Sequence, residues 1–114
     1  MTSGNTEDHS GFGLKFILPT GEELLFTSLP INIGRSAQNN LVINHGSVSA
    51  MHAQVFFDER LKDVCIKDRD SLNGLFIDQK PTRLNVLHDG AKISLGDAVI
   101  DFRDTGYIHV EHSE

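Results

Sequence analysis

Short runs in which apolar and polar residues alternate fill most of the chain from Leu14 onward. Residues that favour turns separate these runs at short intervals, and no stretch shows the 3.6-residue period of an amphipathic helix. The pattern predicts strands at 15–18, 23–27, 31–34, 40–43, 53–58, 63–67, 75–78, 91–95 and 99–103. Many short strands at this spacing are typical of an all-β sandwich or barrel.

Residues 93–102 show the alternation most clearly. Ile93, Leu95, Ile100 and Phe102 alternate with other residues on either side of a Gly-Asp pair. We therefore predict a hairpin whose four apolar side chains face the core. The Pro-Thr-Gly-Glu segment at 19–22 similarly predicts a hairpin loop between the first two strands.

The two ends differ from the middle of the chain. Residues 1–13 are rich in Gly, Ser, Thr and Asn, which predicts a flexible leader. Residues 14–110 are expected to form one β-sandwich, with 107–110 adding a final strand, and 111–114 are expected to fray. No internal repeat or second domain is indicated.

Composition limits the function further. The chain has 114 residues, of which 39% are hydrophobic, so a single core is expected. Its net charge of -6 argues against a general affinity for nucleic acid, and no apolar run approaches the roughly 20 residues of a membrane span. The lone Cys65 lies between Val64 and Ile66, so we expect a buried free thiol in an intracellular, cytoplasmic protein.

Three short motifs stand where predicted strands begin or end. The first is Gly34-Arg35, in which glycine permits unusual backbone geometry and the guanidinium can grip a phosphate through two parallel hydrogen bonds. The second contains Ser49, whose hydroxyl can donate to a phosphate oxygen, and His52, whose ring can lock the loop.

The third motif is Asn73-Gly74, a strong turn signal whose carboxamide can also pair with the backbone of a bound peptide. Ser71, Arg69 and Arg83 lie in or beside the same predicted loops and are expected to assist the peptide contact. Together the motifs supply groups that hold an anion.

In order and spacing these motifs resemble the forkhead-associated (FHA) domain, whose pattern is Gly-Arg, then Ser-x-x-His, then Asn-Gly. The resemblance covers roughly residues 15–103 and implies a two-sheet β-sandwich of FHA and SMAD-like type with recognition loops at one apex. It also implies a signalling module that binds phosphothreonine in a partner protein. Arg35 and Ser49 would then hold the phosphate and Asn73 the peptide, while Gly34, His52 and Gly74 would shape the loops.

Two positions depart from the family pattern. A polar residue often follows the motif Ser, and Thr or Ser often precedes Asn-Gly, but here these positions hold Ala50 and Leu72. Ser71 or Ser47 would have to compensate. The alternative is an assembly module of the same fold that no longer requires phosphate.

Other chemistry is less well supported. Ser49 and His52 include residue types of a hydrolase, but no Gly-x-Ser-x-Gly elbow accompanies them, so no enzymatic activity is expected. His109 and His112 lie among tail glutamates, but a structural metal site would need more ligands than this segment supplies. No metal site and no cofactor are therefore expected. We interpret the aromatic residues, including Phe56 and Phe57, as core.

Overall fold

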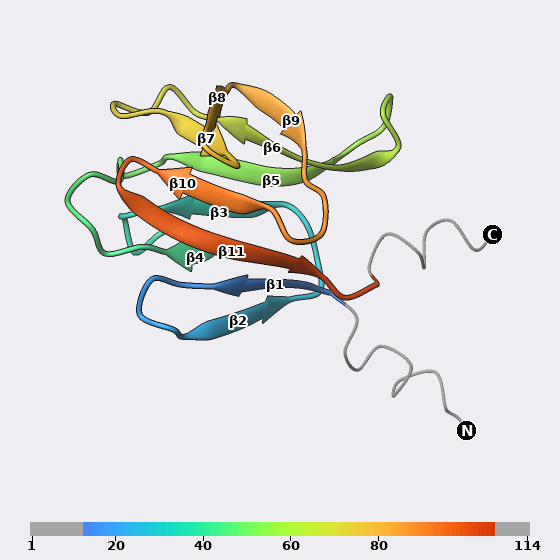
Figure 1. The fold of residues 1–114 in the computed structure, drawn as a ribbon, viewed down its shortest axis with the longest axis horizontal. Coiled ribbons are helices and arrows are strands. Elements are labelled where there is room, and N and C mark those ends of the chain that lie inside the picture. The colour runs from blue at the N-terminus through green and yellow to red at the C-terminus, as the bar shows by residue number, and fades with distance from the viewer. Residues whose placement is uncertain (1–12, 107–114) are drawn as a thin grey trace.

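The computed structural model describes residues 13–106, and within that range the chain forms two β-sheets and no helix (Figure 1). The six-stranded sheet has the order β2-β1-β11-β10-β7-β8. Its strands are β1 (Leu14–Ile17), β2 (Glu23–Phe26), β7 (Leu75–Ile77), β8 (Lys80–Thr82), β10 (Lys92–Leu95) and β11 (Ala98–Asp104). The predicted two-sheet, all-β fold is confirmed.

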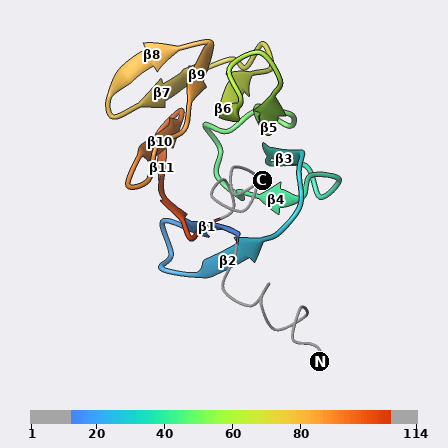
Figure 2. The same ribbon diagram turned by 90° about the vertical axis from the view of Figure 1, so that its right-hand side faces the viewer.

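The second sheet has five strands in the order β4-β3-β5-β6-β9. Its strands are β3 (Ile31–Gly34), β4 (Leu41–Val42), β5 (Ala53–Asp58), β6 (Asp63–Asp68) and β9 (Leu84–Val86). All its neighbouring pairs are antiparallel except β3 and β4, which run parallel. Seen along its length in Figure 2, the molecule is a sandwich of these two sheets.

The core lies between the sheets because alternate residues of each strand point inward. In β3, Ile31 and Ile33 are buried, and in β5 the residues opposite them, Val55 and Ala53, are buried as well. Phe16 and Phe102 face each other across β1 and β11 with ring centroids 5.4 Å apart. Burying such side chains supplies about 1.5–3 kcal/mol each.

The hairpin predicted at 93–102 is confirmed. Leu95 pairs with Ala98 across a two-residue turn, where Gly96 has a φ of +61°. The four predicted inward residues are all fully buried. The segment at 19–22 also forms the expected loop between β1 and β2, in which Leu18 N–H donates to the carbonyl of Glu22 at 2.8 Å.

Two parts of the sequence interpretation were wrong. The edge strands β8 and β9 were not predicted; Pro81 interrupts the apolar pattern of one, and both are only three residues long. Phe56 is not a core residue, since it lies on the outer face of β5, with Lys67 Nζ 5.2 Å from its ring centroid. Phe57 does pack against the core.

Cys65 is fully buried and free, as predicted. Burial, followed by the negative charges of Asp58 and Asp63, raises the pKa of its thiol to about 11. The thiol therefore stays protonated and acts as a small apolar side chain.

Several connections gather at one end of the sandwich, on the left in Figure 1. They include β1 to β2, β3 to β4, β4 to β5, β6 to β7, and β10 to β11, and we call this end the apex. The opposite end, here called the base, includes the β7 to β8 turn and the connection from β9 to β10. The domain boundaries remain predictions: the leader, except Gly13, and the expected strand at 107–110 lie outside the described residues, as does the tail.

Across residues 13–106 we find no helix that is long and apolar enough to span a membrane. In the same range, no three His, Cys, Asp or Glu side chains gather as a metal site would require. The tail histidines considered in the sequence lie beyond it.

Candidate functional site

Arg35 is the first residue after β3 and projects from the apex. Its backbone N–H donates to the carbonyl of Ser49 at 2.9 Å, and its side-chain Nε donates to the carbonyl of Val48 at 2.9 Å. The side chain is thus anchored to the β4–β5 loop while the residue as a whole stays exposed. Within the described part of the chain, no carboxylate forms a salt bridge with the Arg35 guanidinium.

Gly34 is required because no side chain fits at this position, not because the chain turns here. Its φ lies outside the left-handed region, but a Cβ added here would collide with the carbonyl of Ala50 and lie 2.7 Å from Asn39 Nδ2. The glycine therefore lets the two loops approach closely enough for the Arg35 and Ser49 backbones to pair. The prediction that glycine serves here through its backbone freedom is therefore wrong, because the residue is needed for its missing Cβ.

Ser49 lies beside Arg35 and is partly exposed. Its Oγ accepts a hydrogen bond from the backbone N–H of Leu72 at 2.9 Å, which joins the β4–β5 loop to the β6–β7 loop. A hydroxyl has one donor and two acceptor sites, so the O–H of Ser49 still has a proton to donate. The structure thus brings a cation and a hydroxyl donor from two predicted motifs together.

His52 is fully buried beneath these loops. Its Nδ1 accepts from the backbone N–H of Ser49 at 3.1 Å, so its Nε2 carries the proton and donates to the carbonyl of Gly74 at 2.8 Å. Both ring nitrogens are occupied by backbone groups. This arrangement links two loops and leaves no ring nitrogen to activate the Ser49 hydroxyl as a hydrolase would need.

Asn73 is exposed on the β6–β7 loop, and its Nδ2 donates to the carbonyl of Ser47 at 2.8 Å. Gly74 follows with a φ of +89°, a conformation that favours glycine. Ser71 is engaged within the loop, because its hydroxyl donates to Asp68 Oδ1 at 2.6 Å and accepts from the N–H of Gly74 at 2.9 Å. Its assignment to the peptide stays a prediction.

The two auxiliary arginines already have partners. Arg69 NH1 donates to Asn32 Oδ1 at 3.3 Å, and Arg83 NH2 lies 3.2 Å from Asp70 Oδ1. Arg83 and Asp70 are both largely exposed, so this pair contributes little to stability. Arg83 therefore differs from Arg35, which forms no salt bridge with a carboxylate of the described residues.

Sequence reasoning missed the structural importance of two apical residues. Asn39 is 7% exposed, and its Nδ2 donates to the carbonyls of Ser36 and Ala50 at 2.9 and 2.7 Å. Ser47 Oγ accepts from the N–H of Asp97 at 2.8 Å, which ties the β10–β11 turn to the apex. Neither residue belongs to an apolar period, so only the run of loop-forming residues around each hinted at them.

The departures from the family pattern are visible at the surface. Leu72 is 87% exposed and Ala50 is exposed as well. Because both side chains are apolar, neither position offers a side-chain hydrogen bond to a ligand. The two serines expected to compensate are both occupied: Ser71 with Asp68, and Ser47 with Asp97 and His45 Nδ1, the latter at 2.9 Å. Arg35 and Ser49 therefore remain the candidate anion-binding residues of the apex.

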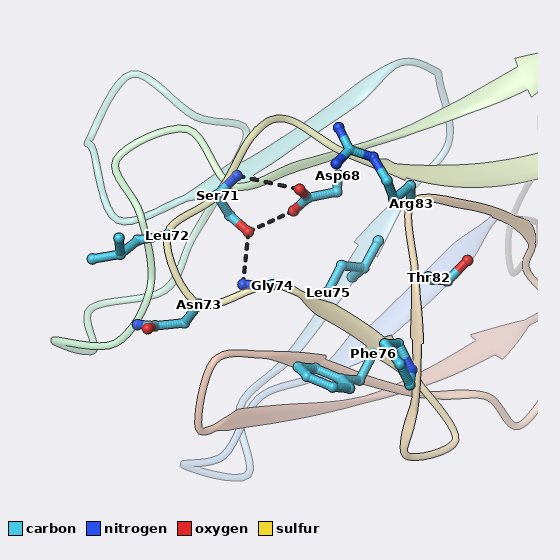
Figure 3. A pocket seen from close by; sticks show the side chains of 10 residues that line it. Asp68, Ser71, Leu72, Asn73, Gly74, Leu75, Phe76, Thr82 and Arg83 are labelled. Carbon is cyan, nitrogen blue, oxygen red and sulfur yellow. Dashed lines mark hydrogen bonds between the residues drawn. The ribbon is translucent and has the colours of Figure 1, made fainter.

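A cleft of about 560 Å³ lies between the β6–β7 loop and β8 (Figure 3). The apolar side chains of Leu72, Phe76 and Pro81 contribute to its lining, as does the charged side chain of Arg83. The cleft also borders Asn73, so a chain bound at the apex can continue into it.

Comparison with known proteins agrees with the motifs. The model of the FHA domain family matches residues 31–96. The human protein "Angiogenic factor with G patch and FHA domains 1" is 29% identical over 96 residues, which cover 75% of this chain. The chain spans only 13% of the length of that relative.

Solved structures share the fold. The N-terminal FHA domain of S. cerevisiae Rad53p, in complex with a phosphothreonine peptide, has a TM-score of 0.71 and 15% identity, covering 82% of this chain and 94% of that one. Mycobacterium tuberculosis EmbR, in complex with a low affinity phosphopeptide, has a TM-score of 0.73 and 22% identity, covering 82% of this chain and 25% of that one.

Proposed function

Because this chain belongs to the FHA domain family, we propose that its apex binds a phosphothreonine-containing segment of a partner protein. The observation that carries the proposal is the pairing of Arg35 with Ser49. The guanidinium is held in place through Nε and the backbone, and Ser49 offers a hydroxyl proton beside it. Phosphothreonine carries about -1.5 to -2 charges near neutral pH, which makes it a suitable ligand for these donors.

Anchoring makes the site effective despite its few donors. Nε of Arg35 donates to the Val48 carbonyl, so the side chain is already partly ordered, and its two terminal nitrogens would bind the ligand at a lower entropy cost. Each hydrogen bond to a charged group contributes about 1.5–3 kcal/mol. Two or three such bonds give a modest affinity for phosphate, to which the peptide chain adds.

Asn73 is proposed to contact the peptide backbone. Its Nδ2 is bonded to Ser47, which fixes the carboxamide at the exposed surface of the apex. The neighbouring cleft would receive a flanking residue, with an apolar side chain against Leu72, Phe76 and Pro81. The partner is thus an extended phosphorylated segment with an apolar residue near the phosphothreonine.

One set of observations favours the alternative, an assembly module that does not require phosphate. Ala50 and Leu72 supply no polar groups, and the hydroxyls of Ser47 and Ser71 are engaged within the fold. Under this alternative, the exposed Leu72 would make an apolar contact with the partner. Phosphorylation would then leave affinity unchanged.

A peptide-library experiment separates the two functions. The full chain is titrated calorimetrically with a degenerate phosphothreonine peptide pool and with its unphosphorylated counterpart. We expect binding of the phosphorylated pool only, and its loss in Arg35→Ala but not in Arg103→Ala, which removes an exposed arginine from β11. Equal binding of both pools would support the alternative and overturn phosphate recognition.

A further inference from the structure

Asn73-Gly74 is also a sequence that is prone to covalent change. Among the seven asparagines of the chain, Asn73 is the only one that glycine follows. Glycine has no side chain to hinder approach to its backbone nitrogen, and it lets the backbone fold back on itself. Asparagine followed by glycine is for these reasons the sequence most prone to spontaneous deamidation.

The reaction proceeds through a cyclic imide. The backbone nitrogen of Gly74 loses its proton and attacks Cγ of Asn73, forming a new C–N bond. The bond from Cγ to Nδ2 breaks, and the amide nitrogen leaves as ammonia after gaining a proton. Water then opens the five-membered ring at either carbonyl, which yields aspartate or isoaspartate; the net change is asparagine plus water to an acid plus ammonia.

The native loop restrains both reacting groups. The attacking nitrogen of Gly74 donates its N–H to Ser71 Oγ at 2.9 Å, and that hydroxyl is itself held by Asp68 at 2.6 Å. The leaving nitrogen, Nδ2 of Asn73, donates to the carbonyl of Ser47 at 2.8 Å. In Figure 3 the carboxamide of Asn73 points away from the nitrogen of Gly74.

We propose that Asn73 is a deamidation site. The hydrogen bonds from Gly74 to Ser71 and from Asn73 to Ser47 keep the deamidation reaction slow in the folded protein, and Asn73 becomes reactive when the β6–β7 loop opens. Reaction requires the Gly74 N–H and the Asn73 carboxamide to leave their partners together. The loop thus protects itself by the same contacts that shape the apex.

Deamidation would change the apex directly. A carboxylate has no N–H to donate to Ser47, and it adds a negative charge near the site of the ligand phosphate. Isoaspartate also lengthens the backbone just before Gly74. The expected loss of peptide binding rests on the proposed function, whereas the reaction itself does not.

The test follows Asn73 by peptide mapping and mass spectrometry, during incubation at mildly alkaline pH. Native protein, protein in concentrated urea, and Ser71→Ala are compared. We expect the native rate at Asn73 to be several-fold below the rate in urea. Loss of the Ser71 hydrogen bond should raise the native rate about fivefold, the factor that corresponds to one ordinary hydrogen bond.

A control separates local opening from general loss of stability. Ile93→Val removes a methylene from the core, and Ile93 lies on β10 outside the β6–β7 loop. It should leave the rate at Asn73 unchanged while lowering the melting temperature. Equal rates in native protein and urea, an unchanged or slower rate in Ser71→Ala, or acceleration by Ile93→Val would each overturn the protective role.

Binding forms a separate arm of the experiment. Deamidated protein, isolated by ion exchange, is titrated with the phosphothreonine peptide pool. If Ser71→Ala accelerates the reaction but the parent binds neither peptide pool, the deamidation site stands and the proposed function fails. If the parent binds only the phosphorylated pool but Asn73 reacts as fast natively as in urea, the function stands and the protection fails.

Discussion

Arg35 at the apex and His88 at the base are held in opposite ways. At the base, His88 Nε2 lies 2.8 Å from Asp78 Oδ2, and Lys92 Nζ on the nearby sheet lies 2.6 Å from Asp101 Oδ1. At the apex, Arg35 is anchored by a backbone carbonyl and has no salt bridge to any described carboxylate. A cation whose position is fixed but whose charge is unmatched distinguishes a binding site from a structural ion pair.

The two ends also differ in how their loops are held. The apical loops depend on buried polar side chains, His52 and Asn39, that bond to backbone groups of other segments. The base relies on largely exposed ion pairs, which contribute little. An apex fixed in this way can hold its donors in place before a ligand arrives, which lowers the entropy cost of binding.

The strongest test of this contrast is Arg35→Ala. We expect phosphopeptide affinity to fall by about 2–5 kcal/mol, the range for removing one partner of a hydrogen-bonded charge pair, because the phosphate loses an anchored cation that no described carboxylate neutralises. The melting temperature should stay near that of the parent, since the side chain is exposed. Calorimetry and thermal melting measure the two effects; unchanged affinity would remove Arg35 from the site.

Restoring the missing polar groups should strengthen the apex. Leu72→Thr, alone or with Ala50→Asn, is expected to improve phosphopeptide binding by roughly 1.5–3 kcal/mol for each new hydrogen bond to phosphate. The gain should shrink below pH of about 6, where the phosphate loses part of its charge. Calorimetry at two pH values measures it. No gain in either variant would mean that these positions do not face the phosphate.

His52→Ala should affect stability more than phosphate contact. The substitution leaves the Ser49 N–H without a partner and leaves the Gly74 carbonyl with only the 3.3 Å hydrogen bond from the Gly96 N–H. A buried group left unsatisfied costs roughly 1–3 kcal/mol of unfolding free energy. Denaturant unfolding measures the loss, and His88→Ala at the base provides the comparison, with a much smaller change expected. A variant that unfolds like the parent but no longer binds would show that His52 contacts the ligand.

The smallest effect concerns pH and the base. The hydrogen bond to Asp78, followed by the one to the Asp89 carbonyl, raises the pKa of His88 above 6.5. The protonated His88 therefore stabilises the fold fully below pH 6.5, and this stabilisation is lost as pH rises through the raised pKa. The Lys92 backbone N–H and then His88 lower the pKa of Asp78 from 3.8, so its contribution is lost only as pH falls through the lowered value. The pair should therefore stabilise most between pH 3.8 and 6.5.

Melting curves of the parent and of Asp78→Asn across this range measure that effect. The difference between the two proteins should narrow above neutral pH, and an NMR titration should find a lower His88 pKa in the variant. A difference that widens as pH rises would contradict the assignment of the pair.

The sequence predicted the central strands better than the edges. Ile93, Leu95, Ile100 and Phe102 are buried on one face, and alternation alone reveals such a pattern. The edge strand Lys80–Thr82 contains a proline and has no buried residue, so only its partner β7 defines it. The turn before it uses non-glycine residues at positive φ, which left no turn signal of the usual kind.

The candidate site shows the same limit. The three motifs were visible because their residue types and order are distinctive, and the structure brings them to one end. The contact of Asn39 with Ala50, eleven residues away, and that of Ser47 with Asp97, fifty residues away, arise only when the sheets assemble. Sequence spacing cannot reveal which hydroxyls remain free for a ligand. The hydroxyls of Ser47 and Ser71 are engaged by Asp97 and Asp68, and only the structure shows this.

The central claim, that the apex recognises phosphate, is tested most directly by NMR. Blocked phosphothreonine and blocked threonine are titrated separately into the isotope-labelled full chain. We predict that phosphothreonine shifts the Arg35 Nε–H signal and the backbone amides of Ser49 and Leu72, while signals at the base, such as that of Lys92, stay in place and threonine has no effect. Identical shifts with both compounds, or shifts confined to the base, would contradict phosphate recognition at the apex.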